Sequence, residues 1–80
     1  MASDDDHEAA RAALQRGEIL PLPRILEIVA EQAPGDVIEV ELDDNHGVLE
    51  YEVKVLAADG RVREVKMNAR TGVVREIEDD

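Results

Sequence analysis

Hydrophobic and polar residues change their spacing along the chain close to residue 35. Before that point apolar residues recur every three or four positions, which is typical of amphipathic helices. Beyond it apolar and charged residues alternate, which is typical of strands with one buried side and one wet side. The pattern therefore predicts a helical N-terminal part followed by a sheet.

Two helices are expected in the first part of the chain. The first is short and rich in Ala, covers about residues 7–17, and follows an acidic end at residues 1–6 that we expect to be disordered. The second has Pro23 in its first turn, where proline is tolerated, and Pro34-Gly35 as its stop. Helical spacing gives each helix an apolar stripe, which consists of Ala10, Ala13 and Leu14 in the first and of Leu22, Ile25, Leu26, Val29 and Ala33 in the second.

Four strands are expected after the helices, separated by turn residues at regular intervals. We place them at residues 36–43, 48–57, 61–69 and 73–78. Short loops make neighbouring strands pair antiparallel in the order of the sequence. The expected fold class is α+β, with one or two N-terminal helices packed on one face of a four-stranded antiparallel meander. This domain would cover residues 18–78 and leave a tail at 79–80.

Loop chemistry fixes the register of the three expected hairpins. The loops are four residues at 44–47, three residues at 58–60, and three residues at 70–72. The second loop sets Tyr51 opposite Met67, and the third closes on Ala69 and Val73. These registers place the apolar residues on one face under the second helix, and that face consists of Ile38, Val40, Leu42, Leu49, Tyr51, Val53, Val55, Val65, Met67, Val73 and Ile77.

The chain is strongly acidic, with a net charge of -11 from 20 acidic and 9 basic residues. This charge repels nucleic acid and anionic membranes, and no apolar run approaches the roughly 20 residues that span a bilayer. The absence of Cys excludes disulfides and Cys-ligated metals. The start of the chain lacks the basic and apolar stretches of a signal peptide, so we expect either a cytoplasmic protein or one from which an export signal has been removed.

No catalytic constellation is recognisable in the sequence. It contains no Gly-rich phosphate loop, no Ser-His-Asp arrangement with a nucleophile elbow, and no His-Glu-x-x-His segment. Its many carboxylates are expected on an exposed face, without the desolvation that makes a general acid. We therefore expect a protein that is not an enzyme and needs no cofactor.

Four carboxylates are expected to gather on the uncovered face of the sheet. The four-residue loop at 44–47 produces two opposed pairs, Glu39 with Glu52 and Glu41 with Glu50. This quartet is a weak candidate for a divalent-cation site, or for a docking patch that attracts a basic partner. We favour a solvated acidic face that keeps a small protein soluble. His46 lacks the ligand pattern of a calcium-binding loop and is expected to be a turn residue.

Apolar residues on the uncovered face and the free edge of the last strand suggest a second candidate surface. The residues are Val37, Leu56, Val62 and Val74. Together with the unpaired backbone of strand 73–78 they could seat a partner strand or a second copy of the chain. A structural homodimer is therefore an alternative, although single exposed Val and Leu residues are common on protein surfaces.

The order of three short motifs resembles the PepSY family. They are APGDVIEVEL at residues 33–42, YEVKV at 51–55, and VKMNARTGVV at 65–74, where Asn68 stands in place of the family's usual Asp. The resemblance covers roughly residues 18–78 and carries no shared catalytic residues. It implies a periplasmic or secreted domain that binds a protein or peptide, such as a secreted metallopeptidase, and inhibits or regulates it. An acidic cation-binding domain and a homodimer module remain the alternatives.

Overall fold

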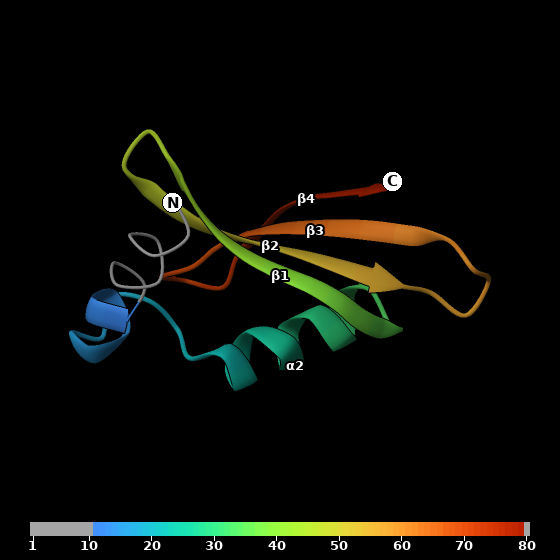
Figure 1. Cartoon of the computed structure of the whole chain (residues 1–80), viewed down its shortest axis with the longest axis horizontal. Coiled ribbons are helices and arrows are strands. Elements are labelled where there is room, and N and C mark those ends of the chain that lie inside the picture. The colour runs from blue at the N-terminus through green and yellow to red at the C-terminus, as the bar shows by residue number, and fades with distance from the viewer. Residues whose placement is uncertain (1–10, 80) are drawn as a thin grey trace.

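The computed structural model describes residues 11–79 of the chain, in which a sheet is covered by helices on one side (Figure 1). Residues 11–15 are helical. The longer elements are α2 (Leu22–Gln32), β1 (Asp36–Asn45), β2 (Val48–Leu56), β3 (Val62–Asn68) and β4 (Val74–Asp79). The strands form one antiparallel sheet in the order β1-β2-β3-β4. The expected α+β fold is confirmed, while the acidic end and residues 7–10 lie outside the described residues.

Helix α2 forms where apolar residues repeat at helical spacing after Pro21. A proline in the first turn lacks only an N–H that would have no helical partner there. Ile25 and Val29 are buried toward the sheet. Pro34 ends the helix because it disfavours helical backbone in the residue before it. The N–H of that residue, Ala33, still donates a closing bond to the carbonyl of Val29, at 2.7 Å.

The core lies between α2 and the central strands, and the segment before α2 contributes to it. Ala13 and Ile19 from this segment are buried. Leu20 ties the segment to the sheet, since its N–H donates to the carbonyl of Ala69 at 2.7 Å and its carbonyl accepts from the hydroxyl of Tyr51 at 3.3 Å. The core cluster consists of Ala13, Ile19, Ile25, Val29, Ala33, Tyr51, Val53, Val55, Val65, Met67 and Ala69.

The register of β2 on β3 confirms the expectation. Tyr51 lies opposite Met67 and Leu56 lies opposite Val62. The N–H of Ala57 donates to the carbonyl of Arg61 at 2.8 Å, which closes the expected three-residue loop. The glycine at the end of this loop permitted the prediction, because a three-residue hairpin favours Gly in the left-handed region.

The register expected for β1 on β2 is wrong by two residues. The hairpin turns through His46 and Gly47 alone, both at positive φ (55° and 85°), as a tight two-residue turn requires. The side chain of Asp44 accepts the N–H of Gly47 at 2.8 Å. Leu42 consequently lies opposite Tyr51 instead of Leu49. A shift of two residues keeps the same side chains on each face of the sheet, so this error does not change which face each residue was expected to occupy.

A bulge in β1 changes the role expected for Ile38. Val37 lies opposite Val55 and Glu39 lies opposite Lys54, which leaves Ile38 without an opposite residue. Ile38 is 54 % exposed and lies outside the core, contrary to the expectation. The bulge also brings Val37, instead of Ile38, to the covered side of the sheet, because residues opposite one another share a face.

A second bulge, between β3 and β4, makes the pairing at the end of their hairpin differ from the expectation. Val65 lies opposite Ile77 as expected, but Met67 lies opposite Val74. The expected closure of the loop on Ala69 and Val73 is wrong, because the N–H of Ala69 donates to Leu49 on β2. Asn68 closes the loop instead, and its N–H donates to the carbonyl of Val73 at 2.9 Å. Val74 therefore packs against the core, whereas Val73 is 65 % exposed.

Candidate functional site

The face of the sheet turned away from α2, which we call the open face, carries most of the charged side chains of the strands. The register places on it Asp36, Glu39, Glu41, Asp43, Glu50, Glu52, Lys54, Leu56, Val62, Glu64, Lys66, Arg75, Glu76 and Glu78. Carboxylates outnumber basic groups in this set by nine to three. The open face is therefore an acidic surface, and its ion pairs decide where the negative charge stays uncompensated.

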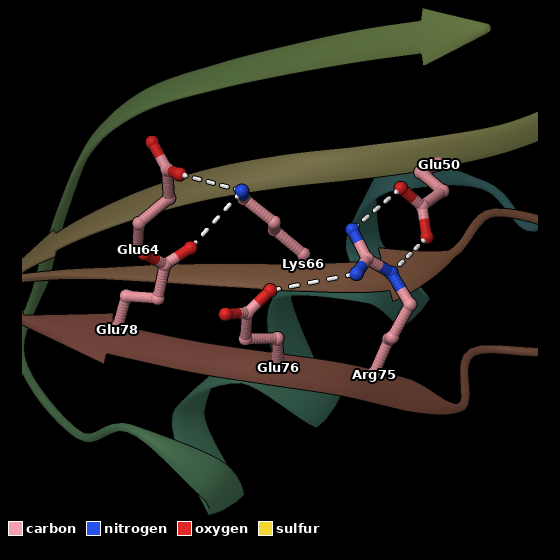
Figure 2. A network of polar contacts seen from close by, with 6 residues as sticks. All are labelled: Glu50, Glu64, Lys66, Arg75, Glu76 and Glu78. Atoms are coloured by element: carbon pink, nitrogen blue, oxygen red, sulfur yellow. Dashed lines mark hydrogen bonds and ion pairs between the residues drawn. The ribbon is translucent and has the colours of Figure 1, made fainter. Parts of the chain in front are cut away.

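Lys66 neutralises part of the charge on the β3–β4 side of the open face (Figure 2). Its Nζ lies 3.0 Å from a carboxylate oxygen of Glu78 and 3.6 Å from one of Glu64. The bond to Glu78 is the main cause that raises the pKa of Lys66, and the same bond lowers the pKa of Glu78. These groups are partly exposed, so the pairs organise the surface more than they stabilise the fold.

Arg75 forms a two-pronged ion pair with Glu50, which is only 5 % exposed (Figure 2). Its Nε lies 2.7 Å from one carboxylate oxygen and its Nη2 lies 3.1 Å from the other. Its Nη1 lies 3.4 Å from Glu76. The pair with Glu50 raises the pKa of Arg75. Parallel charge-assisted bonds of this kind give both energy and fixed geometry, so Glu50 is held in place by β4.

The β1 side of the open face has a different balance of charge. Glu39, Glu41 and Asp43, which we call the β1 carboxylates, follow one another on this side, and residues 36–45 contain no basic side chain. Glu41 lies opposite Glu52, so two like charges face each other. A hydrogen bond and then charge repulsion from Glu39 raise the pKa of Glu41. Burial, followed by the charge of Glu64 and of Asp43, raises the pKa of Glu52.

The expected quartet of carboxylates is not brought together as predicted. Glu39 lies opposite Lys54 instead of Glu52, and Glu50 lies opposite Asp43 while Arg75 binds it. Among residues 11–79, no group of three or more His, Asp or Glu side chains is arranged to hold a metal ion. The correction has one physical cause, the tight turn at residues 46–47, which shifts every carboxylate of β1 relative to β2.

The four apolar candidates are divided between the two faces. Leu56 and Val62 lie opposite each other on the open face, where Leu56 is 38 % exposed. Val37 lies opposite Val55 on the covered face and is 41 % exposed there. Val74 packs against the core. Expectation and structure differ for Val37 and Val74 because each lies beside a bulge that the alternating pattern does not reveal.

A hollow of about 340 Å³ at one end of the sheet was not expected from the sequence. It lies beside the β1–β2 turn and the β3–β4 turn, and its lining consists of Glu18, Asp44, Gly47, Val48, Leu49, Asn68 and Arg70. Three separate segments of the chain form the hollow, so no local sequence motif predicts it. Its carboxylates and its guanidinium occupy one small space, and Arg70 Nε donates weakly to the carbonyl of Glu18, at 3.4 Å.

Comparison with known protein families gives a match that covers most of the chain. The family model described as the peptidase propeptide and YPEB domain, abbreviated PepSY, matches residues 19–78. The chain belongs to the PepSY family. No curated protein and no solved structure matches it. No helix in the described part of this PepSY domain is long and apolar enough to cross a membrane.

The final turn of the PepSY domain shows how it accommodates Asn68. The Oδ1 atom of Asn68 accepts the N–H groups of Arg70 and Thr71, at 2.8 and 3.0 Å. The backbone carbonyl of Asn68 accepts the N–H of Gly72 at 2.8 Å. An amide oxygen supports the turn as a carboxylate would, and it does so without adding a charge beside Arg70.

Proposed function

We propose that this PepSY domain is a non-enzymatic binding module that acts outside the cytoplasm. Its partner is a protein or peptide, and a secreted metallopeptidase that the domain inhibits or regulates is the specific form of the proposal. The observation that carries it is the family match over residues 19–78, because the family takes its description from peptidase propeptides.

The form of the sheet supports binding over catalysis. One face is covered by α2, and the open face presents charged groups on a scaffold of paired strands. The β1 carboxylates are exposed, and the nearly buried Glu50 is paired with Arg75, so neither has the unpaired apolar enclosure that raises a catalytic carboxyl into the working range. A broad surface with an excess of negative charge suits selection and steering of a partner.

The experiment that tests the proposal uses the full chain and a mature secreted metallopeptidase of the thermolysin class. Increasing amounts of the chain are added while hydrolysis of a small peptide substrate is followed, and light scattering measures the mass of the mixture. A secreted serine peptidase of similar net charge is the control. We expect a one-to-one complex with the metallopeptidase and a dose-dependent loss of hydrolysis.

The measurements of mass and of hydrolysis test binding, inhibition and selectivity separately. Complex formation without loss of hydrolysis would retain a binding module and reject inhibition. Equal binding of the serine peptidase would reject selectivity for metallopeptidases. If neither a complex nor inhibition is seen at concentrations well above those of the enzyme, the proposed partner is wrong.

A further inference from the structure

Strand β1 is an edge of the sheet with a long regular stretch. The order β1-β2-β3-β4 leaves one side of β1 without a strand partner in the described part of the chain. After the bulge at Ile38, every residue from Glu39 to Asn45 lies opposite a residue of β2 without interruption. An unbroken edge of this length is a template on which an extended segment can add as a further strand.

The hydrogen bonds of the next hairpin show which backbone groups of β1 point outward. The carbonyl of Leu49 accepts the N–H of Ala69, so Leu49 directs its backbone to the β3 side. Direction alternates along an antiparallel strand, so residues 50, 52 and 54 direct theirs to β1. Their opposite residues on β1 are Asp43, Glu41 and Glu39. The backbone N–H and C=O groups of Val40, Leu42 and Asp44 therefore point away from the sheet.

Side chains on the two faces of β1 define the partner that this edge would accept. On the open face the β1 carboxylates present negative charge to a neighbouring strand. On the covered face Val40 and Leu42 are partly buried and pack against the core. A strand with Lys or Arg at alternate positions would oppose the carboxylates, and Val, Ile or Leu at the positions between would extend the apolar layer.

The raised pKa of Glu41 supports this assignment independently of the edge. A hydrogen bond with Glu39 and repulsion from Glu39 and Glu52 raise the pKa of Glu41 in the free protein, and Lys54 offsets only part of this rise. A Lys or Arg side chain placed beside it would relieve that repulsion. The free protein thus carries an electrostatic penalty that a basic strand removes.

The opposite edge, β4, is a poorer template. It is six residues long, and the bulge beside Arg75 leaves only residues 76–79 in regular order. Arg75 itself is engaged by Glu50 and Glu76. Bulges and charged side chains of this kind are common protections of sheet edges.

A second copy of the chain does not fit the β1 edge. An antiparallel pairing of β1 with β1 centred on Leu42 keeps the covered faces together but sets Glu41 of each copy opposite Asp43 of the other. Like charges directly opposite one another destabilise a strand pair. The edge therefore selects against self-association and for a partner of opposite charge.

We propose that the β1 edge binds an extended basic segment by strand addition, with Lys or Arg facing Glu39, Glu41 and Asp43, and with apolar residues between them. This inference rests on the proposed function as a binding module and names the surface and the chemistry of the partner. It assigns the main-chain contacts to Val40, Leu42 and Asp44.

The test uses the full chain and a short capped peptide in which Lys and Val alternate. Amide hydrogen exchange and NMR titration follow binding at low salt. We expect slower exchange of the Val40, Leu42 and Asp44 amides and little change at Glu39 and Glu41, whose amides already bond to β2. A peptide of the same composition with all Lys residues first is the control for charge without alternation, and it should bind at least about fivefold more weakly.

Backbone methylation of the peptide tests the main-chain contacts directly. If the peptide adds antiparallel to β1, methylation of the Val amides should abolish binding, because those residues exchange hydrogen bonds with the outward groups of β1. Methylation of the Lys amides should then leave binding intact. In the protein, Glu41→Lys should weaken binding by about fivefold or more, while the matched change Glu31→Lys on the exposed side of α2 should have a much smaller effect.

Two results would overturn the inference. One is binding that protects no outward amide of β1, and the other is equal binding of both methylated peptides. Neither result touches the proposed function, because these experiments contain no peptidase. If the domain inhibits the metallopeptidase but does not bind the alternating peptide, the proposed function stands and strand addition at the β1 edge is rejected.

Discussion

Gly35 is the position where the connection from α2 to β1 packs most closely against β2. A Cβ atom added there would overlap the carbonyl oxygen of Leu56 and lie 2.8 Å from Cγ1 of Val55. Both atoms belong to a central strand, so the backbone of β1 or β2 must shift to make room. We expect Gly35→Ala to lower the free energy of unfolding by about 2–3 kcal/mol, because the added Cβ overpacks the junction and because a φ of +153° strains any residue other than glycine.

Gly60 provides the matched control for this substitution. Its φ is +86°, and nothing lies within 4 Å of an added Cβ. Gly60→Ala therefore costs only the left-handed backbone conformation, about 1 kcal/mol. Urea unfolding followed by far-ultraviolet circular dichroism measures both, because the chain has no Trp and a single Tyr. A small core of this kind rarely supplies more than about 3–5 kcal/mol, so Gly35→Ala should unfold at very low urea while Gly60→Ala keeps a folded baseline. A loss for Gly35→Ala no larger than for Gly60→Ala would refute the close packing of this junction.

Three further substitutions and titrations test the charges and the core. Arg75→Gln should lower Tm by roughly 5–10 °C, because the nearly buried Glu50 loses its guanidinium partner, whereas Arg16→Gln in an exposed pair should change Tm little. Equal changes in Tm for Arg75→Gln and Arg16→Gln would contradict a stabilising role of the pair between Arg75 and Glu50. Glu41→Gln should raise Tm by about 2–5 °C at neutral pH. The folded-state pKa of Glu41 lies above that of the unfolded chain, so its charge disfavours folding, and the gain from Glu41→Gln should fade as pH falls through the raised pKa. Burial raises the pKa of Tyr51, so phenolate absorbance should appear at higher pH in the folded chain than in urea. The stability that Tyr51 contributes should be lost as pH rises through its folded-state pKa. Identical titration curves for the folded and the urea-unfolded chain would contradict the burial of Tyr51.

The sequence predicts the fold because its local signals agree with one another. Pro23 and Pro34 bracket α2, and the period changes to two where β1 begins. The loop at 58–60 has one favoured geometry, which sets β2 on β3 correctly. The β1–β2 loop is ambiguous, because Asp44 and Gly47 suit a four-residue loop as well as a two-residue turn. Since both choices keep the same faces, this error affects pairing alone. The expected core loses Ile38 and Val73 beside the two bulges, and Ile77 at the sheet edge is 41 % exposed.

The arrangement of the open face is less predictable than its composition. Alternation alone identifies Glu39, Glu41, Glu50 and Glu52 as members of that face, apart from the local effect of bulges. It does not give their neighbours, because the tight turn changes which carboxylates oppose each other. The bulge at β4 has no sequence signal of its own, yet it turns Val74 inward and accompanies the bond from Arg75 to Glu50. The binding edge on β1 emerges only when the hydrogen bonds of β2 and β3 are known.

An amide and methyl NMR titration of the isotope-labelled full chain with a mature, catalytically inactive secreted metallopeptidase would show whether the domain binds such an enzyme and by which surface. We predict binding that perturbs residues along β1, above all Val40, Leu42 and Asp44, with protection of their amides from exchange. Perturbation confined to α2 or β4 would retain a binding module and reject the β1 edge as its contact surface. The absence of any perturbation at saturating peptidase would contradict the central claim that this PepSY domain binds such an enzyme.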